Sequence, residues 1–224
     1  MSSDLLRRVN DSLDRSRANA AHHPFFAHFL QKKTPEQVRR FAQQWYLAAK
    51  NHKVAFPHLV AITQDDETRR ELIEILRDEY GNGDPDEVHA RLLQKFLEEG
   101  IGMPLPSSGD AVPEIAAFGD KTLTMWRDAD PVTAFGYHYA LERIAQDIHK
   151  VFLHGLENGG FPLEVLKYFV YHSTAEEEHV RITKKGFDRY AADPSNREAL
   201  LNGVTAGEQA LAGMWDGFER HIFH

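Results

Sequence analysis

The segment Tyr171-His172-Ser173-Thr174-Ala175-Glu176-Glu177-Glu178-His179 lies inside an amphipathic pattern that predicts one long helix over residues 163–191. Within it, His172, Glu176 and His179 follow one another at steps of four and three residues, so that all three lie on one face of a helix. Three side chains can therefore converge on one small volume. A Glu followed by a His one turn later is typical of the inward-facing ligands of carboxylate-bridged di-iron sites in helical bundles.

The rest of the chain has almost entirely the pattern of helices. Thr34-Pro35-Glu36-Gln37 combines an N-cap, a proline in the first turn and a capping-box glutamine, and predicts a helix that runs to about Thr63. Alternating Val, Ile and Thr runs bounded by hairpin turns are scarce. We therefore predict an all-α bundle of seven to nine helices in one domain over residues 1–224. The other helices are expected at residues 4–17, in a short segment from residue 22, and at 66–80, 86–99, 112–127, 131–157 and 195–223.

The composition excludes several classes of protein. The 224 residues are 42% hydrophobic and 27% charged, which suits one domain with a sizeable core, and no run approaches the ~18–20 apolar residues of a membrane span. The formal net charge of −8 argues against nucleic acid and anionic membranes as partners. Cysteine is absent, which excludes disulfide scaffolds and thiolate sites, whereas histidine occurs 13 times. With no secretory pattern in the first residues, we expect a cytoplasmic protein whose metal chemistry uses histidine and carboxylate.

Two further segments place candidate ligands in the expected helices. Glu142 lies among apolar and aromatic residues, where a carboxylate is costly to bury unless it is paired or binds a metal ion. Glu79 ends one expected helix and His89 opens the next. The break between them, rich in Gly, Asn, Asp and Pro, lets the chain bend so that both side chains face one site. Within this segment alone, Asp78 is as good a candidate as Glu79.

Together these segments offer three carboxylates and three imidazoles. Calcium and magnesium ions prefer shells of oxygen, and a mononuclear zinc site needs fewer ligands. The set suits two iron or manganese ions that are bridged by carboxylate and keep open positions for dioxygen. The candidate ligands are Glu79, His89, Glu142, His172, Glu176 and His179.

Most of the remaining histidines are expected to lie at the surface or to be hydrogen-bonded in the core. His138 and His149 stand four residues before and seven residues after Glu142, and therefore share its face of the expected helix. We interpret them as hydrogen-bond donors beside the ligands or as core histidines rather than as ligands. The surface or core interpretation applies to His22, His23, His28, His52, His58, His154, His221 and His224.

At these residues the sequence resembles the haem-oxygenase-like di-iron oxidase and oxygenase family. This family is an iron-containing branch of the superfamily of thiaminase II and the pyrroloquinoline-quinone synthesis oxidase. The resemblance covers residues 22–190 and includes His23-Pro24-Phe25, the helix with Trp45-Tyr46, the Glu and His around a glycine-rich break, and Glu142 ahead of the His-x3-acid-x2-His helix. It implies a haem-oxygenase-like helical bundle, the six candidate residues as ligands of two Fe(II) ions, dioxygen as co-substrate and a small-molecule substrate. A homodimer is a family-level expectation.

Two departures from the family pattern concern the second iron. The acid of the His-x3-acid-x2-His helix is often Asp in relatives and is Glu176 here. Some members take a further carboxylate from the helix that corresponds to residues 34–63. Here that helix has no acid past its first turn and offers Lys50, His52 and Lys53 at inward positions. We therefore expect the second iron to be weakly held.

The resemblance favours a di-iron oxidase or oxygenase that oxidises a small amino-acid-like or fatty-acid-like metabolite. Lys50, Lys53 and Arg143 are candidate partners of a substrate carboxylate, although all three also fit a role as surface cations. Tyr46 is a further candidate neighbour of the substrate. The alternatives are a metal-free oxidase resembling the pyrroloquinoline-quinone synthesis enzyme and a non-enzymatic helical protein that binds iron or a partner. Thiaminase II needs a catalytic cysteine, which this chain lacks.

Overall fold

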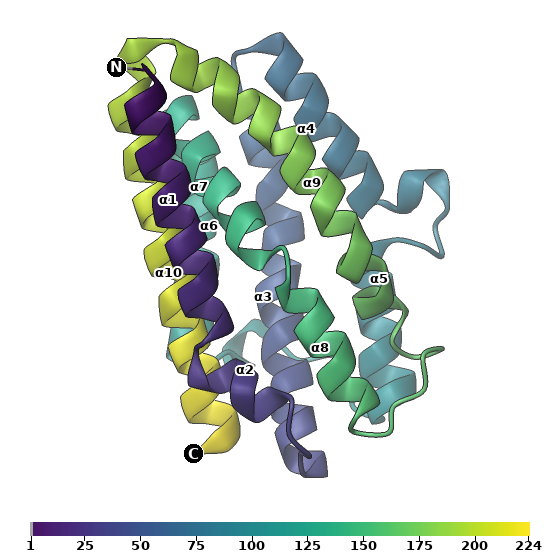
Figure 1. Cartoon of the computed structure of the whole chain (residues 1–224). Helices are drawn as coiled ribbons and strands as arrows, with labels where there is room; N and C mark the ends of the chain where they lie inside the picture. The colour runs from purple at the N-terminus through teal and green to yellow at the C-terminus, as the bar shows by residue number, and fades with distance from the viewer. Residues whose placement is uncertain (1) are drawn as a thin grey trace.

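Long helices that run roughly side by side build the structure (Figure 1), a computed structural model that describes the backbone of residues 2–224 and the side chains of residues 7–16, 22–50, 52–144 and 146–224. The regular elements in this part of the chain are all helices, either α-helices or short 3-10 and π turns, and none is a strand. The predicted all-α bundle is therefore confirmed. None of the described helices is both long and apolar enough to cross a membrane. The α-helices are α1 (Ser2–Ala21), α2 (Pro24–Phe29), α3 (Pro35–Ile62), α4 (Asp66–Glu79), α5 (His89–Lys95), α6 (Pro113–Asp128), α7 (Pro131–Ala145), α8 (Ile148–Glu157), α9 (Lys167–Ala192) and α10 (Arg197–Phe223).

The helix that was predicted from a capping signal begins where that signal stands. At the start of α3, the Gln37 backbone N–H donates to the Thr34 hydroxyl at 3.2 Å, and the Thr34 N–H donates to the Gln37 side chain at 2.9 Å. Asp65 and Asp130 cap α4 and α7 in the same way, by accepting backbone N–H groups of the first turn. Capping bonds therefore fix the first residue of α3, α4 and α7, whereas α5 and α9 begin without a side-chain cap.

The prediction of a single helix over residues 131–157 is wrong. The structure divides it into α7 and α8 at Gln146 and Asp147, where Asp147 has φ −104° and ψ −4°. Neither residue is Gly or Pro, so the sequence contains no breaker that marks this position. The helix predicted over 86–99 is likewise shorter, because α5 begins at His89 and passes into a π turn, η2 (Phe96–Ile101).

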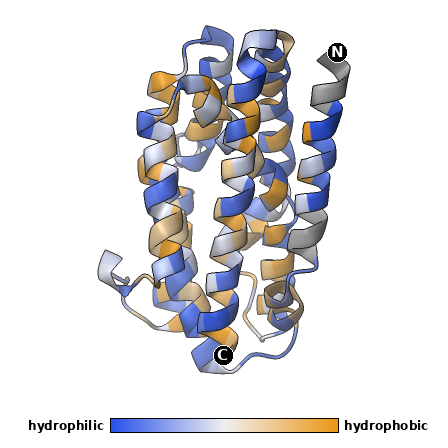
Figure 2. Cartoon of the chain, turned by 90° about the vertical axis from the view of Figure 1, so that its left-hand side faces the viewer, coloured by the Kyte–Doolittle hydropathy of each residue, from blue (hydrophilic) through white to orange (hydrophobic). Residues whose placement is uncertain are grey.

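A cluster of aromatic side chains joins α2, which lies at one end of the bundle (Figure 1), to α3, α8 and α10. Phe25 stacks on Trp215 of α10 with ring centroids 6.0 Å apart, and Phe152 of α8 lies 4.9 Å from Phe41 of α3. Trp45 extends the cluster toward the middle of the bundle, with its ring 4.8 Å from that of Phe152. Hydrophilic residues follow the outward faces of the helices and hydrophobic residues lie between them (Figure 2). Burial of these rings is the main force that holds α2, α3, α8 and α10 together.

Helices α7 and α10 touch through their backbones. A Cβ atom on Gly203 of α10 would lie 2.1 Å from the Thr133 carbonyl oxygen, and one on Gly136 of α7 would lie 2.4 Å from the Leu200 carbonyl oxygen. Only glycine allows this approach, since neither contact leaves room for a side chain. The position of α7, which carries Glu142, is thereby fixed against α10.

We expect Gly203→Ala to lower the free energy of unfolding by about 2 kcal/mol or more, because the new methyl group forces the two backbones apart. Gly213→Ala is the matched control, since a Cβ atom there has no neighbour within 4 Å in the described part of the chain. Replacing glycine by alanine at this open helical position should raise the free energy of unfolding by up to about 1 kcal/mol. Urea unfolding followed by circular dichroism measures both. Equal effects of the two substitutions would contradict a backbone contact between α7 and α10.

Candidate metal centre

The structure brings all six predicted ligands to one cavity of about 350 Å³ in the middle of the bundle. Three helices and the start of a fourth supply them: α4 ends at Glu79, α5 begins at His89, and α7 carries Glu142. The other three, His172, Glu176 and His179, stand on one face of α9, as their spacing predicts. Glu79 is partly buried and the other five are buried.

The side chains form overlapping groups whose ligand atoms lie within 4.8 Å of one another. In the first group, Glu79 Oε2 lies 3.0 Å from His89 Nδ1, and Glu79 Oε1 lies 3.7 Å from His172 Nε2. A second group contains Glu142, Glu176 and His179, with Glu142 Oε2 3.8 Å from His179 Nδ1. Separations of this size suit donor atoms that share a cation, because a bond to zinc or iron is about 2.0–2.2 Å long.

The turn after α4 lets Glu79 and His89 meet. Gly81, Asn82 and Gly83 have φ values of 76°, 54° and 101°, in the left-handed region that favours glycine and asparagine. A Cβ atom on Gly81 would also lie 2.8 Å from the Glu87 carbonyl carbon. The predicted bend is therefore correct, and it depends on Gly81 for both conformation and space.

Asp78 and Glu79, which the sequence left as equal candidates, have different roles. Glu79 lines the cavity, whereas Asp78 lies behind the ligands and accepts hydrogen bonds from the Tyr171 hydroxyl and, at 3.1 Å, from His179 Nε2. His172 is held similarly, since its Nδ1 lies 2.9 Å from the Tyr168 carbonyl oxygen and donates to it. These bonds leave Nδ1 of His179 and Nε2 of His172 directed at the ligand groups, an orientation typical of imidazoles that bind metals.

His149, which was expected to be a donor beside the ligands or a core histidine, belongs to one of the ligand groups. It forms a group with His172 and Glu176, and its Nδ1 lies 3.2 Å from Glu176 Oε1. Its ring lies 4.7 Å from that of His172 and 5.5 Å from that of Trp45. The helical spacing from Glu142 did indicate the correct face, but the break before α8 brings His149 next to α9, which that spacing does not show.

Two buried polar atoms at the site have no hydrogen-bond partner among the described residues: Glu142 Oε2 and the Nε2 ring nitrogen of His149. Buried polar groups without partners are rare in proteins, because each costs about 1–3 kcal/mol. Carboxylate oxygens and imidazole nitrogens that face one cavity are the donors that bind iron, manganese or zinc. The residues present therefore fit a pair of such cations.

The carboxylates are electrostatically coupled. Burial and the negative charge of Glu176 raise the pKa of Glu142 to about 8. Burial also acts to raise the pKa of Glu176, but hydrogen bonding and charge from His149, with the charge of His179, hold it at about 2. Burial acts to lower the pKa of His179, but its bond to Asp78 and the nearby carboxylates raise it to about 10. One proton on Glu142 and one on His179 thus reduce repulsion in the metal-free protein at neutral pH.

Three of the four residues predicted to contact the substrate line the same cavity. Lys50 is exposed, Lys53 is partly buried with its Nζ 4.6 Å above the ring of Tyr80, and Tyr46 is buried with its hydroxyl 3.4 Å from Gln94 Nε2. Arg143, the remaining candidate partner of a substrate carboxylate, is not among the residues that line this cavity and pairs with Asp14 at 2.6 Å.

A family model described as "Iron-containing redox enzyme" matches residues 39–212, which is most of the chain. The chain belongs to this family. The resemblance seen in the sequence is thereby confirmed, and with it the haem-oxygenase-like fold. No curated protein matches the sequence of this family member.

Solved structures similar to this iron-containing family member share its fold at low sequence identity. A CADD-like protein of unknown function from Nostoc punctiforme is 18% identical with a TM-score of 0.81, over 99% of this chain and 98% of the other. A TenA homologue from Pseudomonas syringae is 14% identical with a TM-score of 0.78, over 98% and 96%. A domain of unknown function with a haem-oxygenase-like fold from Shewanella denitrificans is 16% identical with a TM-score of 0.69, over 97% and 91%.

We expect cation binding to release protons at neutral pH, because a metal ligand must be deprotonated and Glu142 and His179 hold protons in the metal-free site. The apparent affinity for Zn(II) should therefore rise between about pH 6 and 8, by about tenfold per pH unit for each proton released. Calorimetry in buffers of different ionisation enthalpy counts these protons.

Asp78→Asn should release fewer protons than the unaltered protein, since the pKa of His179 falls when its carboxylate partner is lost. His154→Ala, at an exposed position of α8, should release the same number. An affinity for Zn(II) that does not change over this pH range would show that the site is already deprotonated.

Proposed function

We propose that this iron-containing redox family member is a non-haem di-iron oxidase or oxygenase that activates dioxygen to oxidise a small amino-acid-like or fatty-acid-like metabolite. The observation that supports it is the convergence of three carboxylates and three imidazoles on one cavity, where the buried Glu142 Oε2 lacks a hydrogen-bond partner within the described chain. A cavity of this kind without cations would keep like charges close together at a cost in free energy.

The two groups of side chains would each hold one ion. Glu79, His89 and His172 would bind the first. Glu142, Glu176 and His179 would bind the second, and His149 is a further donor beside Glu176. When bound, two ferrous ions supply the electrons and the open coordination positions that the reduction of dioxygen requires.

The rest of the cavity wall has the properties of a binding site for a small organic acid. Trp45, Trp215, Phe118 and Met214 give it an apolar surface that excludes water from the reacting groups. Lys50 and Lys53 are the cations that line it, within the described chain, and a substrate carboxylate needs a partner of this charge.

Iron content and dioxygen uptake test the proposal. Protein loaded anaerobically with Fe(II) should hold about two iron ions per chain and should consume dioxygen faster with the correct member of a panel of amino acids and fatty acids. His172→Ala should lower both iron content and the rate of uptake, the rate by about 100-fold or more, and leave helicity unchanged. His154→Ala is the control, because this side chain is exposed.

The alternatives give different results. Substrate-dependent dioxygen uptake without bound iron would favour a metal-free oxidase. Two bound iron ions without uptake for any compound of the panel would favour an iron-binding protein that is not an enzyme.

Replacing Lys50 and Lys53 together by methionine should raise the concentration of a carboxylate substrate that gives half the maximal rate, by about tenfold, because the charge that offsets the carboxylate is lost. Iron content should stay the same, since neither lysine belongs to a ligand group. Steady-state dioxygen uptake against substrate concentration measures the effect. Lys150→Met, at a residue that pairs with the exposed Glu177, is the control.

A further inference from the structure

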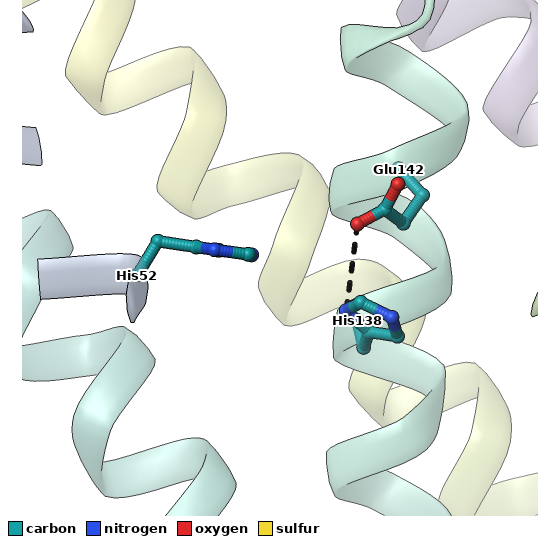
Figure 3. A group of neighbouring side chains, drawn as sticks. All are labelled: His52, His138 and Glu142. Carbon is teal, nitrogen blue, oxygen red and sulfur yellow. Dashed lines mark ion pairs between the residues drawn. The ribbon is translucent and has the colours of Figure 1, made fainter. Parts of the chain in front are cut away.

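Glu142 also faces two histidines that the proposed di-iron centre does not use. His138 stands one turn before Glu142 on α7, and His52 reaches toward α7 from α3 (Figure 3). The ligand atoms of these three side chains lie within 4.8 Å of one another. From the sequence alone, His52 was expected at the surface or in the core, and His138 was expected to be a hydrogen-bond donor or a core histidine.

His138 is fully buried, with 0% of its surface exposed, and both of its ring nitrogens lack a hydrogen-bond partner in the part of the chain that the structure describes. Its ring contacts Phe56 and Trp126, with centroids 5.0 Å and 5.6 Å away. An imidazole that served only to fill this aromatic space would leave two polar atoms unsatisfied, although phenylalanine could fill the same space without that cost.

The two oxygens of Glu142 point to opposite sides. Oε2 lies 3.8 Å from His179 Nδ1, toward α9, whereas Oε1 lies 3.8 Å from His138 Nδ1 (Figure 3). The separation from His138 is too long for a hydrogen bond but close to that of two ligands on one tetrahedral cation, about 3.4 Å for bonds of about 2.1 Å.

His52 completes the group from the opposite wall. It lines the cavity and is partly buried, and its ring lies 4.9 Å from that of Trp126 and 5.5 Å from that of Phe56. The same two aromatic rings therefore hold both histidines in place. With Glu142 between them and the di-iron groups, the three side chains offer two nitrogen donors and one oxygen donor.

We propose that His52, His138 and Glu142 form a further binding position for a divalent transition-metal ion, on the side of Glu142 away from α9. Two imidazoles and one carboxylate suit Zn(II) or Fe(II) and do not suit Mg(II) or Ca(II). The position shares Glu142 with the proposed di-iron centre, but it does not depend on any redox activity of that centre.

Zn(II) binding tests the position. The unaltered protein and the variants His138→Phe and His52→Phe are saturated with Zn(II), passed through a desalting column and analysed for bound zinc. Phenylalanine preserves the ring contacts with Phe56 and Trp126 and removes the nitrogens. Each variant should hold one zinc ion per chain fewer than the unaltered protein. His58→Phe, at an exposed position on α3, should hold as many as the unaltered protein.

The outcome depends on the difference in bound zinc between each variant and the unaltered protein, and not on the total zinc content. If both variants keep the zinc content of the unaltered protein, His52 and His138 are core histidines and the position does not exist. A protein that binds Zn(II) through His138 but fails to bind two iron ions would leave this position standing and overturn the di-iron function. If His138→Phe does not fold, as judged by circular dichroism, His52→Phe at the cavity wall carries the test.

Discussion

Two buried carboxylates, Glu142 and Glu176, and the partly buried Glu79 lie among imidazoles at the centre of a helical bundle, and they are the constraint on which this structure depends. Glu142 and Glu176 repel each other in a space that water screens poorly, so protons or cations must offset their charge. The helices that surround them are placed so that each carboxylate meets a histidine. Because the candidate ligands come from α4, α5, α7 and α9, a bound pair of ions would join four helices, and its binding free energy would add to the stability of the folded chain.

Much of the fold and of this centre could be predicted from the sequence, because the decisive signals are local. The cap at Thr34 and the ligand face of α9 each depend on spacing within one helix. The choice between Asp78 and Glu79 could not be made, because both stand in the last turn of α4 and only its rotation against α9 separates them. The break at Gln146 and Asp147 has no local signal, and the proximity of His149 to Glu176 could not be predicted without it.

The approach of His52 to His138 was missed for a tertiary reason. The two residues stand on different helices, and their separation is set by how α3 and α7 pack around Phe56 and Trp126. Composition and periodicity do not contain that information. Similarly, a TenA homologue at 14% identity shares the architecture, and an architecture alone does not determine chemistry. The chemistry depends on the side chains that line the cavity.

The backbone contact between Gly136 of α7 and Gly203 of α10 restricts where Glu142 can lie, because α7 cannot come closer to α10. Glu79 and His89 stand instead on either side of a turn with three successive residues in left-handed torsions, Gly81 to Gly83, and their relative position depends on the conformation of that turn. The cavity therefore combines one carboxylate that is placed by packing between helices with two donors that are placed by a local turn.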